Sequence, residues 1–455
     1  MEINKIVINQ RAYFNTGVTK DLKFRLQALD SLYDSIIFHE NDILLALKKD
    51  LNKSDIEAYM TEISLLKADI KYIRRRLPRW VKPTKVRTAL MQMPARCYVV
   101  KDPYGVSLIM SPWNYPLLLA LSPLVGSIAG GNCTVIKPSA YAKETSLVID
   151  KIINKAFSPE YCTVVQGGRT ENTELLQQKF DYIFFTGSVE VGKLVMESAA
   201  KNLTPITLEL GGKSPVIIEA SADIDKAAKK LVFGKYINAG QTCIAPDYVL
   251  VPEKMKDQLI SSLRKYINEF YPQDNEGSVI DYPKIISEKH FLRLQKLIET
   301  SKVVIGGKAN KQKMSIEPTV MEDINYQSPV MQEEIFGPIL PLITYTNLDE
   351  VLKKLQASPK PLALYLFTNN KDIKKKVLRE ISFGGGCIND VIMHIATSQM
   401  GFGGVGDSGM GSYHGKLSFD TFTHKKSIVD KGKAFDLTIR YRPYTDKKKE
   451  WLRKF

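Results

Sequence analysis

The 455-residue chain carries 64 Lys and Arg against 49 Asp and Glu, a formal net charge of +15, and 44% of its residues are hydrophobic. This composition excludes an intrinsically disordered chain, and at roughly 100–200 residues per domain the length predicts two or three domains. The five cysteines form no CxxC pair and the five histidines show no metal-binding spacing. We therefore expect no structural zinc, no disulfide framework and a reducing, cytoplasmic location.

The beginning of the chain has no apolar core of the signal-peptide type. The longest nearly apolar stretch, residues 117–130, contains Ser, Pro and Gly and is shorter than the roughly 18–20 residues that span a bilayer. We expect no transmembrane anchor. The positive charge leaves nucleic acid, a membrane surface or an anionic ligand open as partners.

The first 80 residues predict helices, because apolar residues such as Leu22, Leu29 and Ile36 recur at near-helical spacing. Ser54 and Glu57 resemble a capping box that opens a further helix. Residues 84–110 are β-rich instead, and the turn-like sequence DPYG at 102–105 separates the runs 96–100 and 106–110.

From there the chain alternates between short apolar strands and helices, which predicts a parallel, doubly wound α/β fold. The first series has strands at 134–136, 162–165, 182–185 and 206–208, with helices at 143–156, 171–178 and 189–200. The second has strands at 216–218, 248–251, 302–305 and 364–367, with helices at 224–236, 254–270 and 288–299. We place the boundary between the two near Gly211 and Gly212. The glycine-rich stretch GFGGVGDSGMG at 401–411 is interpreted as an ordered turn.

Two features of the first series suit a phosphate-bearing ligand. Gly187 and Ser188 follow the strand 182–185 and open a helix, so the helix amides could face a phosphate. This is not a GxGxxG fingerprint, and a plain turn explains Gly187 equally well. Lys137 ends a strand and suits ribose hydroxyls or phosphate, although a solvated lysine is the plain alternative.

A candidate nucleophile lies in the second series. Cys243 follows a Gly-Gln-Thr loop and precedes a strand, a placement used for reactive thiols. Asn114 could donate to an oxyanion, and Glu209, at the end of the strand 206–208, could act as a general base. Each residue also has a simpler explanation. Cys243 could be a structural cysteine, Asn114 a helix cap and Glu209 a solvated carboxylate.

At these residues the sequence resembles the aldehyde dehydrogenase superfamily, and within it the branch of class 3 and fatty aldehyde dehydrogenases. The resemblance covers nearly the whole chain. The motifs that carry it are SPWNYP at 111–116, VIKPS at 135–139, FFTGS at 184–188, LELGGKSP at 208–215, GQTCIAPDY at 240–248, EEIFGP at 333–338 and GFGGVGDSGMGSYHGK at 401–416.

The resemblance implies two doubly wound parallel-sheet domains and a protruding β arm for oligomerisation, hence a homodimer. A Rossmann-like dinucleotide-binding domain would comprise residues 1–83 and 104–210, and a catalytic domain residues 211–418. Residues 84–103 and 419–440 would bridge or oligomerise, and residues 441–455 would form a basic tail.

The resemblance also implies a mechanism. Cys243 would attack an aldehyde, with the Asn114 amide and its own backbone N–H stabilising the oxyanion of the thiohemiacetal. Hydride transfer to nicotinamide would leave a thioester, and Glu209 would activate the water that hydrolyses it. No metal is needed. The implied cofactor contacts are Lys137, Gly187, Ser188, Glu334, Phe336 and Trp113.

One departure bears on the cofactor. NAD-preferring relatives commonly have a Glu three residues after the strand-end lysine, where it accepts from the ribose 2′-OH. Here that residue is Ala140, which would not repel a 2′-phosphate. We therefore expect NAD or NADP as cofactor, with NADP accepted; Tyr141 or Lys143 could compensate and preserve NAD use.

Apolar residues near these motifs suggest the substrate. Tyr115, Leu118 and the stretch 392–395 could line a tunnel for medium-chain, long-chain or aromatic aldehydes, or could simply be core. Within the motifs no Arg is present to hold a carboxylate, which argues against a semialdehyde. A CoA-acylating or semialdehyde dehydrogenase of the same superfamily is the nearest alternative, and a cofactor-independent Cys hydrolase a remote one.

Much of the charge surplus lies at the end of the chain. Residues 425–455 hold 11 basic and four acidic residues, a net +7 outside every motif. This predicts a basic tail that packs on the dimer or touches an anionic membrane surface weakly, with a solvated tail as the alternative. No nucleic-acid partner is expected, since no DNA- or RNA-binding motif is present.

Overall fold

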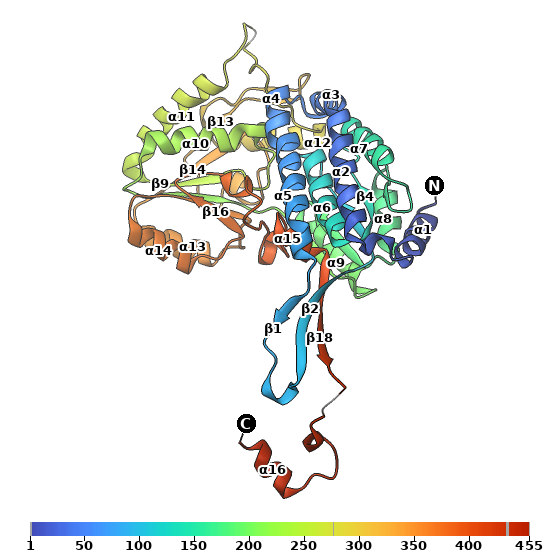
Figure 1. Ribbon diagram of the computed structural model, residues 1–455. Helices are drawn as coiled ribbons and strands as arrows, with labels where there is room; N and C mark the ends of the chain where they lie inside the picture. The colour runs from blue at the N-terminus through green and yellow to red at the C-terminus, as the bar shows by residue number, and fades with distance from the viewer. Residues whose placement is uncertain (1, 276, 434–435, 455) are drawn as a thin grey trace.

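The computed structural model describes residues 2–275, 277–433 and 436–454. Figure 1 shows a body built of two sheets with helices packed around them, and an arm that projects from it. The chain begins at the body, and its last described helix lies beyond the tip of the arm.

The first sheet has six strands in the order β17-β7-β6-β3-β4-β5. Its strands are β3 (Val106–Met110), β4 (Cys133–Lys137), β5 (Cys162–Val164), β6 (Tyr182–Thr186), β7 (Ile206–Glu209) and β17 (Gly409–Met410). All neighbours are parallel except β17, which runs antiparallel to β7 and pairs Gly409 with Glu209. The glycine-rich stretch is therefore partly an edge strand beside Glu209.

Nine α-helices precede the strands of this sheet or alternate with them along the chain. They are α1 (Ile3–Asn15), α2 (Leu22–Phe38), α3 (Glu40–Leu51), α4 (Asp55–Ala58), α5 (Ser64–Trp80), α6 (Pro116–Gly130), α7 (Lys143–Ala156), α8 (Arg169–Gln177) and α9 (Val189–Ala200). Helix α6 is buried along most of its length. Pro116 stands in its first turn, where no N–H is needed, and Gly131 ends it in the left-handed conformation at φ 90°.

The second sheet has seven strands in the order β10-β13-β14-β9-β8-β15-β16. Its strands are β8 (Pro215–Ile218), β9 (Tyr248–Pro252), β10 (Lys302–Ile305), β13 (Thr319–Glu322), β14 (Ile339–Tyr345), β15 (Ala363–Phe367) and β16 (Gly385–Ile388). Its helices are α10 (Ile224–Tyr236), α11 (Lys256–Phe270), α12 (Glu288–Ile298), α13 (Leu348–Gln356) and α14 (Lys371–Glu380). A separate pair comprises β11 (Ala309–Asn310) and β12 (Ser315–Ile316).

The prediction of doubly wound parallel sheets is confirmed, with one refinement. Each sheet ends in an antiparallel strand, β17 in the first and β10 in the second. Parallel strands with helices on both faces are buried on both sides. Their near-continuous apolar runs, such as the fully buried β6, β9 and β15, were the signal in the sequence.

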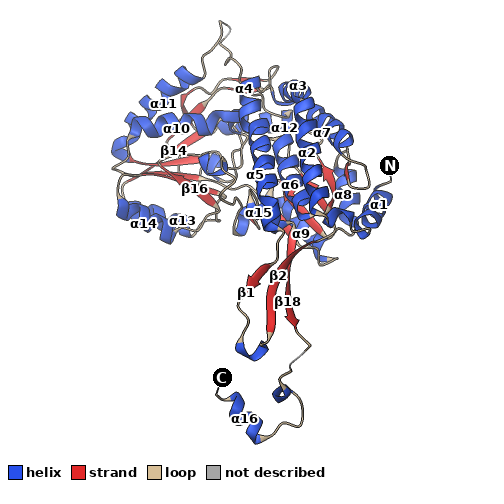
Figure 2. Cartoon of the chain, viewed as in Figure 1, coloured by secondary structure: helices blue, strands red, loops and turns tan. Residues whose placement is uncertain are grey.

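The arm is a three-stranded antiparallel sheet, as Figure 2 shows. It comprises β1 (Thr84–Val86), β2 (Ala95–Pro103) and β18 (Thr423–Lys431), and β18 pairs along the whole of β2. The expected turn at 102–105 does not join a two-stranded ribbon, because β3 is buried along its length and belongs to the centre of the six-stranded sheet. Helix α15 (Lys416–Thr421) precedes β18, and α16 (Asp446–Leu452) follows it.

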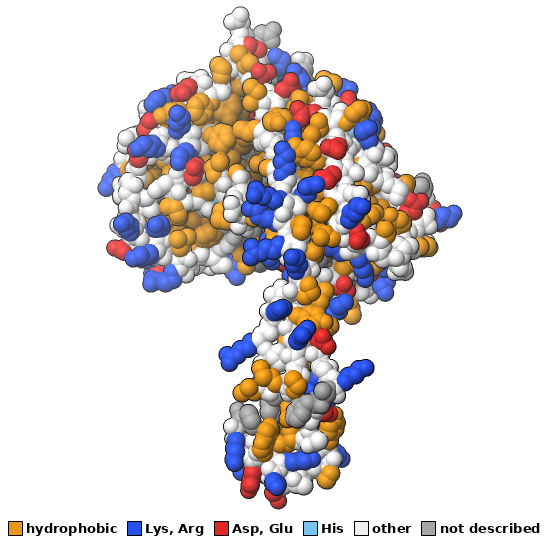
Figure 3. Space-filling view, in the orientation of Figure 1, with side chains coloured by type: hydrophobic (Ala, Val, Ile, Leu, Met, Phe, Trp, Pro, Cys, Tyr) orange, Lys and Arg blue, Asp and Glu red, His pale blue; other side chains and the backbone are white. Residues whose placement is uncertain are grey.

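The arm and tail carry exposed apolar side chains, including Val86, Leu90, Val429, Trp451 and Leu452. On the face in Figure 3, basic side chains are spread over body and arm with acidic ones among them. Within the described residues, no helix has the length and apolarity needed to cross a membrane.

Candidate active site

The turn that carries Cys243 has an unusual backbone. Asn238 and Ala239 both adopt the left-handed conformation, at φ 52° each, and Gly240 follows at φ 71°. Two such non-glycine residues in succession are costly and persist only where their surroundings enforce them. A Cβ at Gly240 would also collide with the carbonyl of Gly337. The chain therefore bends sharply between α10 and β9 and presents Cys243 on the bend.

Cys243 is partly exposed and lines a cavity of about 320 Å³. Burial raises the pKa of its thiol strongly, and the carboxyl groups of Glu334 and Glu209 raise it further. The backbone N–H groups of Cys243 and Ile244 act in the opposite direction. A raised pKa makes the thiol harder to ionise, so attack on a substrate requires a base to take its proton.

Asn114 lies between β3 and α6 and is 2% exposed. Its side-chain Nδ2 donates to the backbone carbonyl of Gln241 at 3.0 Å, two residues before Cys243. Its own backbone carbonyl accepts from Nδ2 of Asn238 at 2.8 Å. The amide is thus tied to the turn that carries Cys243, and one Nδ2 hydrogen is left to face a ligand.

Glu209 ends β7 and is 3% exposed. Neither of its carboxylate oxygens has a hydrogen-bond partner among the described residues. Burial raises the pKa of this carboxyl well above its usual value. An unpaired buried carboxyl with a raised pKa is suited to take a proton from water or a thiol near neutral pH.

The cavity beside Cys243 is largely apolar. Its wall is formed by α5 and the turn before it, by α6 and α10, by the turn that carries Cys243 and by the segment 392–402. Its apolar lining includes Met60, Leu65, Leu118, Leu119, Phe233, Ile244, Ile392, Met393, Ile395 and Phe402. Among the described lining residues no Lys or Arg occurs, and the single acidic one is Asp69, whose pKa burial raises to about 6.

The structure places most of the expected tunnel residues on this wall, namely Tyr115, Leu118 and three of the four residues in 392–395. His394 is the exception. Its Nδ1 lies 3.6 Å from the Cys387 sulfur, and its ring packs near Tyr365 and Phe402. Burial lowers the pKa of His394 to about 4, which favours the neutral form of this half-buried ring at pH 7.

Lys137 ends β4 and is 3% exposed. Its Nζ donates to the carbonyl of Pro138 at 2.8 Å and to that of Gly167 at 2.6 Å. Burial lowers its pKa to about 8, while Glu171 opposes that shift. Ala140 lies exposed three residues further on. A partly dehydrated ammonium held at the end of a parallel strand suits ribose hydroxyls.

Gly187 and Ser188 connect β6 to α9. The Ser188 hydroxyl accepts from the Val191 N–H at 3.4 Å and caps the helix. A Cβ on Gly187 would collide with the Phe185 ring. The N-terminus of α9 thus lies at the carboxyl edge of the first sheet, where dinucleotide phosphates bind in folds of this class.

Glu334 and Phe336 come from one segment, and Trp113 comes from another. The Trp113 and Phe336 rings meet edge to face at 5.3 Å. Burial raises the pKa of Glu334 to about 8, although the N–H of Gly212 and nearby cations act to lower it. A Cβ at Gly211 would meet the Glu334 carboxyl, so a larger residue there would displace that side chain. These groups could hold the ribose and ring of a nicotinamide nucleotide. No group of acidic, Cys or His residues within the described ranges could hold a metal.

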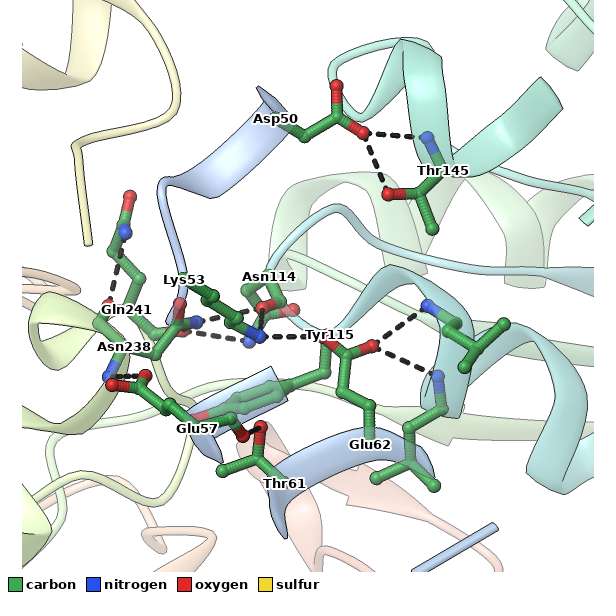
Figure 4. Close-up of polar contacts among 12 residues, drawn as sticks. Asp50, Lys53, Glu57, Thr61, Glu62, Asn114, Tyr115, Thr145, Asn238 and Gln241 are labelled. Atoms are coloured by element: carbon green, nitrogen blue, oxygen red, sulfur yellow. Dashed lines mark hydrogen bonds and ion pairs between the residues drawn. The ribbon is translucent and has the colours of Figure 1, made fainter. Parts of the chain in front are cut away.

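A further set of polar residues lies behind the site, and no motif in the sequence points to it. Figure 4 shows Lys53, Glu57 and Glu62 in contact with the segments that carry Asn114 and Asn238. The Ser54 hydroxyl caps α4 as expected, but Glu57 does not complete a capping box. Its Oε1 accepts from the N–H of Asn238 at 2.8 Å instead.

The chain is similar to known proteins along almost its whole length. The family model described as "Aldehyde dehydrogenase family" matches residues 1–428. The chain is 47% identical over 441 residues to 4,4'-diaponeurosporen-aldehyde dehydrogenase of Staphylococcus aureus, covering 96% of each chain.

Two further proteins inform the reading. The dimeric NADP-preferring aldehyde dehydrogenase of Canis lupus familiaris is 42% identical over 444 residues, covering 97% of this chain and 98% of that one. A solved structure described as the substrate-bound state of Staphylococcus aureus AldH matches with a TM-score of 0.97 at 45% identity, covering 100% of this chain and 99% of that chain.

Proposed function

Since the chain belongs to the aldehyde dehydrogenase family and is an NAD(P)-dependent enzyme that oxidises aldehydes, we propose that it works through a thioester on Cys243. The observation that carries the proposal is the grouping of Glu209 and Asn114 around Cys243, which lines the apolar cavity. The Glu209 carboxyl acts electrostatically on its thiol, and Asn114 is bonded two residues away.

In the first step the Cys243 sulfur bonds to the aldehyde carbon. The thiol must lose its proton, and Glu209 and Glu334 are the carboxylates whose charges act on it. The aldehyde oxygen becomes an oxyanion, and the Asn114 amide and the Cys243 N–H are the donors for it. The Cys243 N–H donates to no backbone carbonyl among the described residues.

Bound NAD(P) supplies the nicotinamide carbon that accepts the hydride from this adduct. The residues that would hold the cofactor are Lys137 for the adenosine ribose, Gly187 and Ser188 for the pyrophosphate, and Glu334, Phe336 and Trp113 for the nicotinamide end. The buried ammonium at a strand end and the capped helix N-terminus fit such a nucleotide.

The thioester on Cys243 is then hydrolysed by water. Glu209 is the proposed general base, since its carboxyl is buried, without a hydrogen-bond partner in the described residues, and has a raised pKa. Retention of this base favours release of a free acid over transfer of the acyl group to coenzyme A.

For the substrate we propose an aldehyde with an extended apolar chain, either long-chain aliphatic or aromatic. The apolar wall of the cavity supports this, and its described lining offers no cation to hold a semialdehyde carboxylate, while Asp69 would repel one when ionised. The relative at 47% identity is named for 4,4'-diaponeurosporen-aldehyde, so that aldehyde is a candidate as well.

The test is a matrix of hexanal, decanal, benzaldehyde and succinic semialdehyde, each with NAD and with NADP, followed by absorbance of the reduced cofactor. Each CH₂ group that enters an apolar cavity contributes about 0.8 kcal/mol. We therefore expect kcat/KM for decanal to exceed that for hexanal by roughly tenfold or more. Succinic semialdehyde as the best substrate would contradict the proposal.

In the same matrix we expect NADP to be used at least as well as NAD, because Ala140 is exposed and places no carboxylate at the ribose. The relative from Canis lupus familiaris is named as NADP-preferring. Ala140→Glu is the matched control and should lower kcat/KM for NADP only. A preference for NAD above roughly tenfold, about 1.4 kcal/mol, in the unmodified enzyme would overturn the expectation.

We also propose that the chain forms a homodimer through the arm. A three-stranded sheet with open edges and exposed apolar side chains such as Val86 and Val429 is supported by little of its own core. Pairing with a second copy would cover both features. Sedimentation at micromolar concentration should give a dimer, and a monomer there would count against the proposal.

A further inference from the structure

A charge pair is sealed inside the protein next to the active site. Lys53 and Glu62 each have 0% side-chain exposure, and their charged atoms lie 2.6 Å apart. Neither residue was expected to have a role, and neither belongs to a motif discussed above. Burying two charges is costly even when they are paired, and apolar replacements are often as stable. A purely stabilising role is therefore a poor explanation for this pair.

Glu62, the acidic member of the pair, lies in an irregular helical stretch. Between α4 and α5 the backbone forms a π-helical stretch, Tyr59–Ile63, that includes Glu62. Single π-helical turns inside α-helices often mark functional sites. Within this stretch Met60 and Thr61 line the substrate cavity, while Glu62 is fully buried. The same turn thus borders the cavity on one side and, through Glu62, holds the start of α6 on the other.

Glu62 and Lys53 together hold the segment that joins β3 to α6. The second oxygen of Glu62 accepts from the N–H groups of Leu117 at 2.9 Å and Leu118 at 3.2 Å, in the first turn of α6. The Lys53 ammonium donates to the backbone carbonyl of Asn114 at 3.2 Å and lies 4.1 Å from the centre of the Tyr115 ring. Figure 4 shows these contacts converging on one short segment.

Within that segment, the side chains of Asn114 and Tyr115 reach the turn that carries Cys243. Asn114 donates to the Gln241 carbonyl at 3.0 Å, and the Tyr115 hydroxyl lies 2.7 Å from the Thr242 hydroxyl. We propose that Lys53 and Glu62 are positioning residues that fix the direction of the Asn114 amide relative to Cys243. This inference rests on the proposed roles of Asn114 and Cys243.

The first test compares three variants. Lys53→Met should lower kcat/KM by roughly 10- to 100-fold, because the Asn114 carbonyl loses its charged donor and the amide can turn. Lys49→Met is the matched control: Lys49 pairs with Glu144 at 3.3 Å on the surface, with 67% and 39% exposure, and its loss should change kcat/KM by less than about twofold.

The third variant separates positioning from stability. Lys53→Met combined with Glu62→Gln removes both charges, so no unpaired charge stays buried, and the melting temperature should recover relative to Lys53→Met alone. Under the proposal kcat/KM stays low, because the bond to the Asn114 carbonyl is still missing. Recovery of kcat/KM together with stability would show a merely structural pair and overturn the proposal.

A double-mutant cycle tests whether Lys53 acts through Asn114. In the Asn114→Ala background, Lys53→Met should lower the initial burst of reduced cofactor by no more than about threefold. If Lys53→Met lowered the burst by the same factor in this background as in the otherwise unmodified enzyme, the inference would be overturned. Tyr115→Phe, which leaves the buried charges intact, should also slow the burst if the segment orients Cys243, even if Lys53→Met does not fold. Failure of the proposed function is recognised separately, because Cys243→Ala would then stay active.

Discussion

Replacing Cys243 with alanine should abolish aldehyde oxidation, with a loss of at least roughly 10³-fold in kcat, because Cys243 is the sole thiol among the described residues that line the cavity. Reduced cofactor is followed with decanal at saturating NADP and again with NAD. Cys243→Ser should be nearly as inactive, since a hydroxyl is a far weaker nucleophile than a thiolate.

Cys97→Ala is the matched control for this prediction. Cys97 lies on the arm strand β2, outside the cavity, and is likewise a free, partly exposed cysteine. Its loss should leave kcat unchanged, and circular dichroism should show that every variant keeps the fold. Turnover that survives in Cys243→Ala would rule out the thioester mechanism.

Replacing Glu209 with glutamine should separate the two halves of the reaction. Without the base, thioester hydrolysis should slow by roughly 10²- to 10⁴-fold. Formation of the thioester should continue, provided that Glu209 is not also the base for the Cys243 thiol. Stopped-flow measurement should then show about one burst of reduced cofactor per site with little turnover after it, and mass spectrometry should find the acyl group on the enzyme.

The sign of the pH dependence follows from the raised pKa of Glu209. Only the carboxylate form can take a proton, so deacylation in the unmodified enzyme should fall as the pH drops through that pKa. The same shift means that the folded state holds the proton more tightly than the unfolded chain, so ionisation above pH of roughly 4.5 destabilises the fold. Glu209→Gln should therefore be no less stable than the unmodified protein at pH 7.

Glu160→Gln serves as the control, because Glu160 is an exposed carboxylate remote from the cavity wall. It should change neither the burst nor the steady-state rate. Steady-state turnover that survives in Glu209→Gln at the unmodified rate would assign the base to another group.

Local patterns explain how much of the fold was predicted. Helix α9, at Val189–Ala200, and helix α10, at Ile224–Tyr236, begin and end where the sequence predicted. Strand β14 was missed, because Pro341 lies within it and a proline argues against a central strand. Strand β16 was missed as well, since its sequence GGCI offers few β-forming side chains.

The candidate active site was likewise predicted only in part. Cys243, Asn114 and Glu209 could be named because each stands in a short motif with its own turn or strand end. Lys53 and Glu62 could not, because in the sequence they look like two of many charged residues on a helical surface. Only the fold shows that they face each other, and only the tertiary contacts show which backbone they hold.

The contacts around the turn that carries Cys243 bear on how the enzyme folds. The bonds that join this turn to Asn114 and Glu57 link residues 124, 127 and 181 positions apart in the chain. Closing such distances is slow and follows the formation of local helices. The left-handed backbone at Asn238 and Ala239 lacks its supporting contacts until helix α4 and the segment that joins β3 to α6 pack against this turn. We therefore expect catalytic activity to appear late in folding, once these distant segments have packed against the turn that carries Cys243.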